Sequence, residues 1–228
     1  MTQNKTILAV FDFDGTLTSG HLWMGIAKHH WKKKVKRMAL IGYITSHLPL
    51  LLLAKTKIYS QEKNRAKWGE DLIGLLKDFT IEETEAIFQW VTDEYFWPLM
   101  RQDVIARLNQ HKQQGHKIVL LSGMFTPYLR IIGKKLKADY VIGTEMELKE
   151  QRYTGKIIQP LCFSDNKAKY LNRFIERQQF DIDLTASSAY ADSFYDLPVL
   201  EMIGYPVATY PDRRLLELAK ENGWEIIG

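Results

Sequence analysis

Short segments with the pattern of buried strands recur along the chain, and stretches with helical periodicity separate them. The strand-like segments are residues 6–11, 118–121, 140–142, 185–190 and 206–209. The helical stretches are residues 103–114, 128–136 and 197–202. Gly115 follows the first of these helices as a signal for its C-terminus. Strands that alternate with helices form a parallel sheet covered on both faces, so the sequence predicts an α/β fold.

The stretch between the first and second strands departs from this alternation. Residues 19–98 contain segments with helical spacing and no convincing strand. We therefore expect a core domain made of residues 1–17 and 99–228, with a helical domain inserted at residues 18–98. A β-hairpin is expected at residues 145–156, where apolar positions alternate around a turn.

One part of the insertion, residues 38–54, is largely apolar and follows a basic run at residues 32–37. Its 17 residues fall short of the roughly 20 that a membrane-spanning helix needs. Pro49 predicts a break, so we expect two buried or amphipathic helices and no stable membrane insertion. Contact of this segment and the basic run with a membrane surface stays open as an alternative.

The composition limits the binding partners and the cellular compartment that we expect for this protein. The formal net charge of +4 suits an anionic substrate and does not predict a nucleic-acid partner. Cys162 is the only cysteine, so no disulfide can form within the chain. Residues 1–5 show no signal-peptide pattern, and the expected location is therefore cytoplasmic. The six histidines show no metal-site spacing, and monomer and dimer both stay open.

The strongest candidate for chemistry is the segment DFDGT, which follows the first strand. Asp12 and Asp14 stand two residues apart, so their side chains point to the same side of an extended chain. At the carboxyl end of a parallel strand this side faces the ligand-binding crevice, and Gly15 permits a sharp turn there. Two close carboxylates repel unless a cation lies between them, which predicts a metal site, an acid/base pair, or both. The alternative is an Asp-Gly turn with no chemical role.

Polar residues follow two later strands or begin a helix at the same predicted edge. Ser122 and Gly123 come directly after residues 118–121 and can cradle an anion, although Ser122 is also a candidate helix N-cap. Lys167 begins a helix and can neutralise phosphate, although most lysines are solvated. Asp192 and Asp196 follow residues 185–190, where helix capping is the alternative. Together the set supplies a nucleophile, an acid/base, metal ligands and phosphate binders.

These motifs, in this order, resemble those of the haloacid dehalogenase superfamily, in the branch that includes phosphoserine phosphatases. The resemblance covers nearly the whole chain and implies a Rossmann-like parallel core with a helical cap inserted after the first strand. It implies that Asp12 is the nucleophile and Asp14 the general acid/base. Ser122, Gly123 and Lys167 then bind phosphate, with Cys162 five positions before the lysine. Asp14 also argues against a dehalogenase, which needs no second carboxylate.

The mechanism implied by the resemblance is a magnesium-dependent phosphomonoester hydrolysis through an aspartyl-phosphate. Asp12, the backbone carbonyl of Asp14, and Asp192 are expected to hold Mg²⁺. Asp196 is expected to orient Lys167 or a metal-bound water. Two further classes stay open, which are a phosphotransferase or mutase with the same intermediate, and an idle binding module.

Departures from the relatives bear on the substrate. Phosphoserine phosphatases carry a glutamate where this chain has His21, and a cap arginine where alignment through residues 75–78 gives Leu72. Losing both ion-pair partners disfavours an amino-acid zwitterion as the leaving group. We therefore expect that phosphoserine is not the main substrate. The apolar cap segment resembles that of some phosphatidylglycerophosphate phosphatases, which keeps a lipid phosphate as an alternative to a small phosphomonoester.

Overall fold

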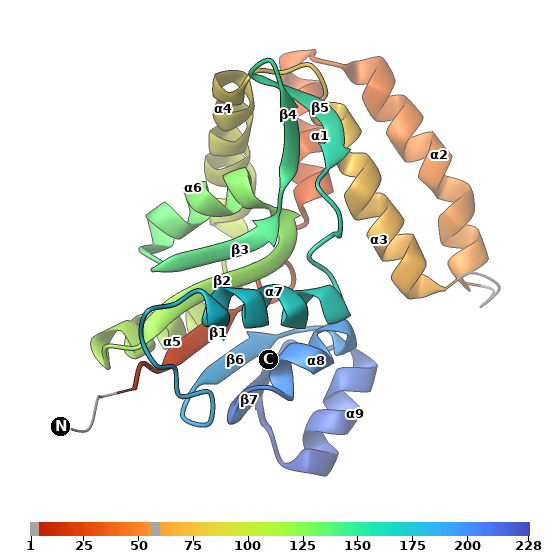
Figure 1. Cartoon of the computed structure of the whole chain (residues 1–228). Helices are drawn as coiled ribbons and strands as arrows, with labels where there is room; N and C mark the ends of the chain where they lie inside the picture. The colour runs from red at the N-terminus through yellow and green to blue at the C-terminus, as the bar shows by residue number, and fades with distance from the viewer. Residues whose placement is uncertain (1–4, 56–59) are drawn as a thin grey trace.

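The computed structural model describes residues 5–55 and 60–228, and its centre is a six-stranded parallel sheet (Figure 1). The strands are β1 (Leu8–Phe11), β2 (Lys117–Phe125), β3 (Tyr140–Thr144), β6 (Ser188–Ala191), β7 (Tyr205–Thr209) and β8 (Glu225–Ile227). They lie in the order β3-β2-β1-β6-β7-β8, and each neighbouring pair is parallel. The predicted α/β sheet is confirmed, and β8 is the strand that the sequence did not reveal.

Alternate residues of β1 point to opposite faces of the sheet, and each face has its own apolar cluster. Ala9 and Phe11 belong to one cluster, while Leu8 and Val10 belong to the other. Helices α5 (Gln102–Gln113) and α6 (Thr126–Leu136) cover the first face. The second face is covered by α7 (Asp165–Glu176), α8 (Leu197–Leu200) and α9 (Arg213–Asn222). Because all four side chains of β1 are buried, the strand is apolar throughout.

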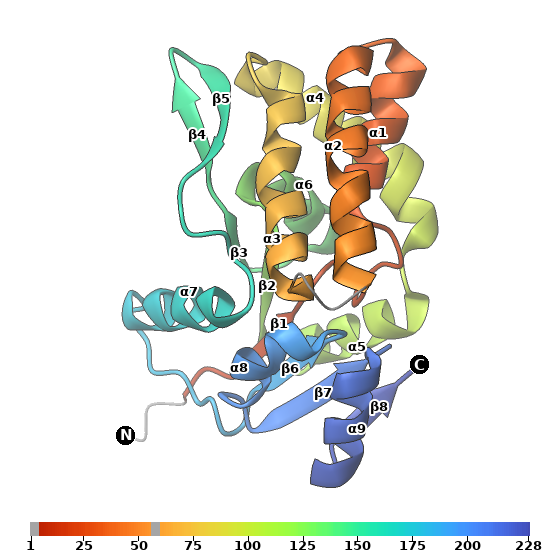
Figure 2. The same cartoon turned by 90° about the vertical axis from the view of Figure 1, so that its right-hand side faces the viewer.

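The insertion forms a helical layer beyond the carboxyl edge of the sheet (Figure 2). Its helices are α1 (Leu22–Lys33), α2 (Arg37–Lys55), α3 (Gln61–Leu72) and α4 (Ile81–Val91), followed by short turns at residues 92–96 and 97–99. The chain leaves and re-enters the core at one place, because Arg101 N–H donates to the carbonyl of Leu17 (2.9 Å) and Ser19 N–H to that of Leu99 (3.1 Å). The predicted hairpin is present as β4 (Met146–Lys149) and β5 (Arg152–Ile157).

The helix α4 begins where local chemistry favours it. The hydroxyl of Thr80 accepts from the N–H of Glu83 (3.2 Å), and the Glu83 carboxylate accepts from the N–H of Thr80 (2.8 Å). This reciprocal capping satisfies two N–H groups that a helix start leaves without partners. Ile87, Phe88 and Val91 then bury one face of the helix.

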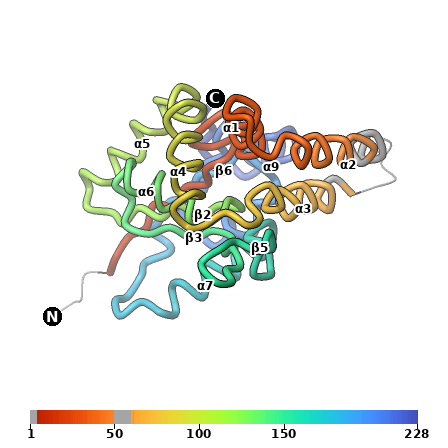
Figure 3. Tube along the Cα trace, turned by 90° about the horizontal axis from the view of Figure 1, so that it is seen from above, coloured from red at the N-terminus to blue at the C-terminus, as the bar shows by residue number. Residues whose placement is uncertain are grey.

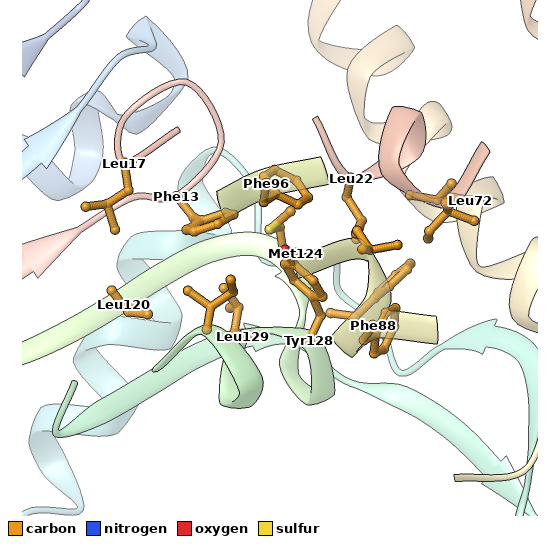
Figure 4. Close-up of a cluster of buried hydrophobic side chains, with 14 of the residues drawn as sticks. Phe13, Leu17, Leu22, Leu72, Phe88, Phe96, Leu120, Met124, Tyr128 and Leu129 are labelled. Atoms are coloured by element: carbon orange, nitrogen blue, oxygen red, sulfur yellow. The ribbon is translucent and has the colours of Figure 1, made fainter. Parts of the chain in front are cut away.

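One apolar cluster joins this helical layer to the sheet (Figure 4). Phe13, which follows β1, lies 5.2 Å from Phe96 and 6.1 Å from Tyr128, measured between ring centroids. Tyr128 also contacts Phe88 of α4, with 5.3 Å between the rings. The part of the insertion that contains α4 therefore packs onto α6. It is held to the core by this packing as well as by its two covalent connections.

The prediction of two helices broken before Pro49 is wrong, because α2 continues through this proline. A proline inside a helix costs about 3 kcal/mol or more. Contacts with α3 hold the turns before Pro49 in place. The Tyr43 hydroxyl donates to the carbonyl of Trp68 (2.9 Å), and His47 Nε2 lies 3.2 Å from Asp71 Oδ2.

Candidate active site

The carboxyl ends of β1 and β6 lie side by side and carry two of the predicted aspartates. Asp12 and Asp192 each follow directly on the last residue of these neighbouring strands. The N–H of Asp12 donates to the carbonyl of Tyr190 (3.0 Å), so strand pairing continues up to the site. The hydroxyl of Thr16 donates to Asp192 Oδ1 at 3.4 Å. The parallel register thus brings together carboxylates that are far apart in the sequence.

Lys167, at the start of α7, lies between two of the carboxylates. Its Nζ is 2.8 Å from Asp12 Oδ1 and 2.6 Å from Asp196 Oδ1, and none of the three side chains is more than 7% exposed. Burial opposes the charge of Lys167, but the two carboxylates outweigh burial and raise its pKa. Burial also raises the pKa of Asp196 to about 6, although Lys167 acts against the rise. The alternative of a solvated lysine is excluded by this ion-paired, buried position.

Three carboxylates form a group that fits a divalent cation. Oxygen atoms of Asp12, Asp192 and Asp196 all lie within 4.8 Å of one another. Burial, and then the charges of Asp12 and Asp196, raise the pKa of Asp192 well above its ordinary value. When all three carboxylates are ionised, their negative charge exceeds what the single ammonium of Lys167 offsets. Close carboxylate oxygens with this excess charge suit a hard cation such as Mg²⁺. The expected metal set named the backbone carbonyl of Asp14 instead of Asp196, and that role of Asp14 stays a prediction.

Asp14 has a free oxygen that faces a dry environment. Its Oδ1 is buried and has no hydrogen-bond partner among the described residues. Burial first, and then the charges of Asp12 and Asp192, raise the pKa of Asp14 well above its usual value. A carboxyl group with a raised pKa keeps its proton to a higher pH than an ordinary carboxyl group does, which suits a general acid. Gly15 has a φ of +84°, a conformation that glycine adopts readily, and so lets the loop turn here. A Cβ at this position would also lie 2.2 Å from Asp192 Oδ2.

Ser122 and Gly123 lie within β2, next to β1. The side chain of Ser122 is buried, and its Oγ accepts from the N–H of Met124 at 3.4 Å. The N-cap residue of α6 is Phe125, so the alternative role of Ser122 as that cap is excluded. The carbonyl of Gly123 accepts from the Thr144 hydroxyl (2.8 Å), which in turn accepts from the N–H of Cys162 (3.1 Å). These bonds tie the strand end to the loop that leads to Lys167.

Sequence reasoning missed Arg65, which α3 extends from the insertion toward the core. Its guanidinium donates to Ser193 Oγ (3.2 Å) and lies 5.3 Å from the ring centroid of Tyr195. Burial raises the pKa values of Asp192 and Asp196, and the charge of Arg65 opposes that rise. The arginine thus brings a positive charge from the helical layer to the edge of the carboxylate group.

The two residues expected to determine specificity have different surroundings. His21 is the N-cap residue of α1, and burial, then the charge of Arg65, lower its pKa. Leu72, by contrast, is 5% exposed and belongs to the apolar cluster that joins the helical layer to the core. Arg65 precedes Leu72 by seven residues, which is two helical turns and returns to the same helix face. That spacing was the available signal for Arg65.

Comparisons with known proteins agree with this arrangement. The profile of the haloacid dehalogenase-like hydrolases matches residues 9–201, and the chain belongs to this family. It is 26% identical over 227 residues to the phosphoserine phosphatase SerB1 of Mycobacterium tuberculosis, covering 97% of this chain and 70% of that protein. It is 25% identical over 233 residues to the histidinol-phosphatase of Neisseria meningitidis, covering 96% of this chain and 97% of that protein.

A solved structure supports the fold. The crystal structure of a protein of unknown function from Bordetella pertussis Tohama I superposes with a TM-score of 0.83 at 22% identity, covering 99% of each chain. The predicted membership of the haloacid dehalogenase superfamily, and the resemblance to its phosphoserine phosphatase branch, are confirmed. The expectation that the chain is a hydrolase of this family is confirmed with them.

Proposed function

We propose that this protein is a phosphoric monoester hydrolase that removes phosphate from a small molecule through an aspartyl-phosphate on Asp12, with Mg²⁺ as its cofactor. The observation that carries the proposal is the position of Asp12. Its carboxylate lies against Lys167 and belongs to the carboxylate group with Asp192 and Asp196. A cationic partner and oxygen ligands around one carboxylate form a site for phosphoryl transfer.

In the first step an oxygen of Asp12 forms a bond to phosphorus while the bond to the leaving oxygen breaks. Asp14 donates its proton to that leaving oxygen, as its raised pKa allows. Asp14 then accepts a proton from the water that attacks the acyl-phosphate, which releases phosphate and restores Asp12. Asp12, Asp192 and Asp196, or the backbone carbonyl of Asp14 in place of one of them, would hold Mg²⁺, which offsets negative charge between nucleophile and phosphate.

The remaining residues bind and orient the phosphoryl group. Lys167 neutralises its charge, and its two ion pairs fix the position of the ammonium group. Ser122 and the backbone N–H groups near Gly123 donate to phosphate oxygens. Residues 18–98 form the cap in this proposal, and they limit the access of water and of large leaving groups.

A phosphate-release screen tests the reaction class. We would measure kcat/KM with Mg²⁺ over phosphoserine, histidinol phosphate, sugar phosphates, nucleotides and lysophosphatidate. Release from at least one of these, with a phosphoryl adduct on the peptide that contains Asp12 after acid quench, is expected. No release from any of them, or release without an adduct at Asp12 in a rapid quench, would contradict the proposal.

A lipid phosphate is the second candidate substrate, and the exposed apolar side chains of α2 favour it. Met38 and Leu48 are 78% and 51% exposed on this helix. A preference for lysophosphatidate over every water-soluble substrate in the screen would select this candidate. An added alcohol that accepts phosphate faster than water does would instead identify a phosphotransferase.

A further inference from the structure

The first half of the insertion is far more basic than the rest of the chain. Residues 15–61 contain eight Lys and Arg and no Asp or Glu. The whole chain has 31 basic and 27 acidic residues, so the remainder carries 23 basic and 27 acidic ones. The excess positive charge of the protein therefore comes from the region of α1 and α2.

Large apolar side chains are exposed in the same region. Trp31 is 56% exposed at the end of α1, and Met38 and Ile41 are 78% and 42% exposed on the first turns of α2. Leu48 continues this face of α2 and is 51% exposed. We call Trp31, Lys33, Lys34, Met38, Ile41 and Leu48 the cap-tip surface.

Contacts within the turn hold the apolar and basic groups together. The guanidinium of Arg37 donates twice to the carbonyl of Trp31 (3.2 and 2.8 Å), and its Cζ lies 4.8 Å from the Trp31 ring centroid. Lys32 pairs with Glu94 at 3.6 Å. Lys33 and Lys34 are exposed and have no ion-pair partner in residues 5–55 and 60–228, so their charge is available to a partner.

The position of α2 leaves this surface open. The turn between α1 and α2 lies at the end of the helical layer away from the sheet (Figure 2), and α2 projects beside α3 from the rest of the molecule when it is seen from above (Figure 3). Its inner side packs on α3 through Tyr43 and His47. Met38, Ile41 and Leu48 are on the side that faces solvent.

We propose that the cap-tip surface docks onto the surface of an anionic lipid bilayer. Exposed lysines attract the anionic headgroups, and apolar side chains beside them enter the boundary between headgroups and acyl chains. A nucleic acid would use the lysines alone, since Met38, Ile41 and Leu48 gain nothing from phosphates. The contact is peripheral, because no helix among the described residues is long and apolar enough to cross a bilayer. This proposal does not depend on the hydrolase chemistry.

Vesicle co-sedimentation tests the proposal with the full chain. Vesicles of phosphatidylcholine alone are compared with vesicles that contain phosphatidylcholine and phosphatidylglycerol in a two-to-one ratio, at low and high salt. We expect binding to the anionic vesicles that weakens with salt. Lys33→Glu with Lys34→Glu should lower the partition coefficient about tenfold or more. Met38→Asn with Ile41→Asn should also lower the partition coefficient, although it leaves the net charge unchanged.

Matched variants elsewhere on the surface serve as controls. Lys156→Glu with Lys220→Glu makes the same charge change at exposed sites outside the cap tip, and Tyr205→Asn with Ile158→Asn replaces side chains that are 62% and 55% exposed. All variants should keep the wild-type circular dichroism spectrum. Equal binding to both vesicle types, or equal losses in the control variants, overturns the proposal. The proposal is also overturned if the Met38→Asn, Ile41→Asn variant binds as the wild type does and added DNA abolishes binding. That result identifies a polyanion site instead.

Discussion

The sheet edge and the helical insertion contribute to the candidate site in different ways. The sheet edge supplies Asp12, Lys167 and Asp196, which are buried and joined by ion pairs of 2.8 and 2.6 Å. The insertion supplies Arg65, an exposed side chain that, within the described part of the chain, has one hydrogen bond to a hydroxyl group and one ring contact. The half that would perform chemistry is therefore fixed by its own contacts. The half that would recognise the leaving group keeps a charge available for a ligand.

The largest effect should come from the centre of the sheet edge. Asp12→Asn should abolish phosphate release, because an amide oxygen cannot form the acyl-phosphate, while the fold is retained. Asp181→Asn, an exposed aspartate, is the matched control and should keep full activity. The measurement is kcat with Mg²⁺. Retention of more than about a hundredth of the rate, a loss below about 2.7 kcal/mol, would remove Asp12 as nucleophile.

Removal of the metal should also stop the reaction. Excess EDTA should abolish phosphate release and Mg²⁺ should restore it, because repulsion within the carboxylate group needs a cation. Asp192→Asn should raise the Mg²⁺ concentration that gives half of the maximal rate. Full activity in EDTA would show that Lys167 alone neutralises the site and that Asp192 has no metal role.

A smaller and more selective effect is expected at Arg65. Arg65→Ala should raise KM by about tenfold for a substrate whose leaving group carries a second anionic group, because a charge-assisted hydrogen bond is lost. Arg65→Lys should recover part of this loss, and Lys63→Ala on the same helix should cause none. With p-nitrophenyl phosphate, whose leaving group adds no anionic group to the phosphate, the KM of Arg65→Ala should stay near that of the wild type. An equal loss with both substrates would place Arg65 at the phosphoryl group instead.

The difference between the sheet edge and the insertion explains which parts of the site the sequence could predict. Asp12, Ser122 and Asp192 lie in or directly after β1, β2 and β6, so the parallel arrangement of the sheet brings them to one edge. Lys167 begins α7 after a loop, and it joins them through its ion pairs. The hydrophobic pattern of the sequence alone is enough to predict the strands β1 and β2.

No comparable rule predicts how the helices of the insertion are arranged. The path of α2 past Pro49 depends on tertiary contacts such as Tyr43 with Trp68, which sequence spacing does not show. The choice of Leu72 rested on an alignment within helices whose boundaries are uncertain by a few residues. The structure buries Leu72 and directs Arg65, two turns earlier, toward Ser193.

The smallest expected effect concerns the identity of the substrate. We expect phosphoserine to be a poor substrate, because His21 stands where relatives use a glutamate to bind the ammonium group. Burial and the charge of Arg65 lower the pKa of His21, so the imidazole is neutral at pH 7 and offers no negative charge. His21→Glu should raise kcat/KM for phosphoserine several-fold relative to histidinol phosphate, with His21→Gln as the uncharged control. If the wild type already prefers phosphoserine by tenfold, about 1.4 kcal/mol, Arg65 binds the substrate carboxylate without help from position 21, and the specificity role that we assign to His21 is wrong.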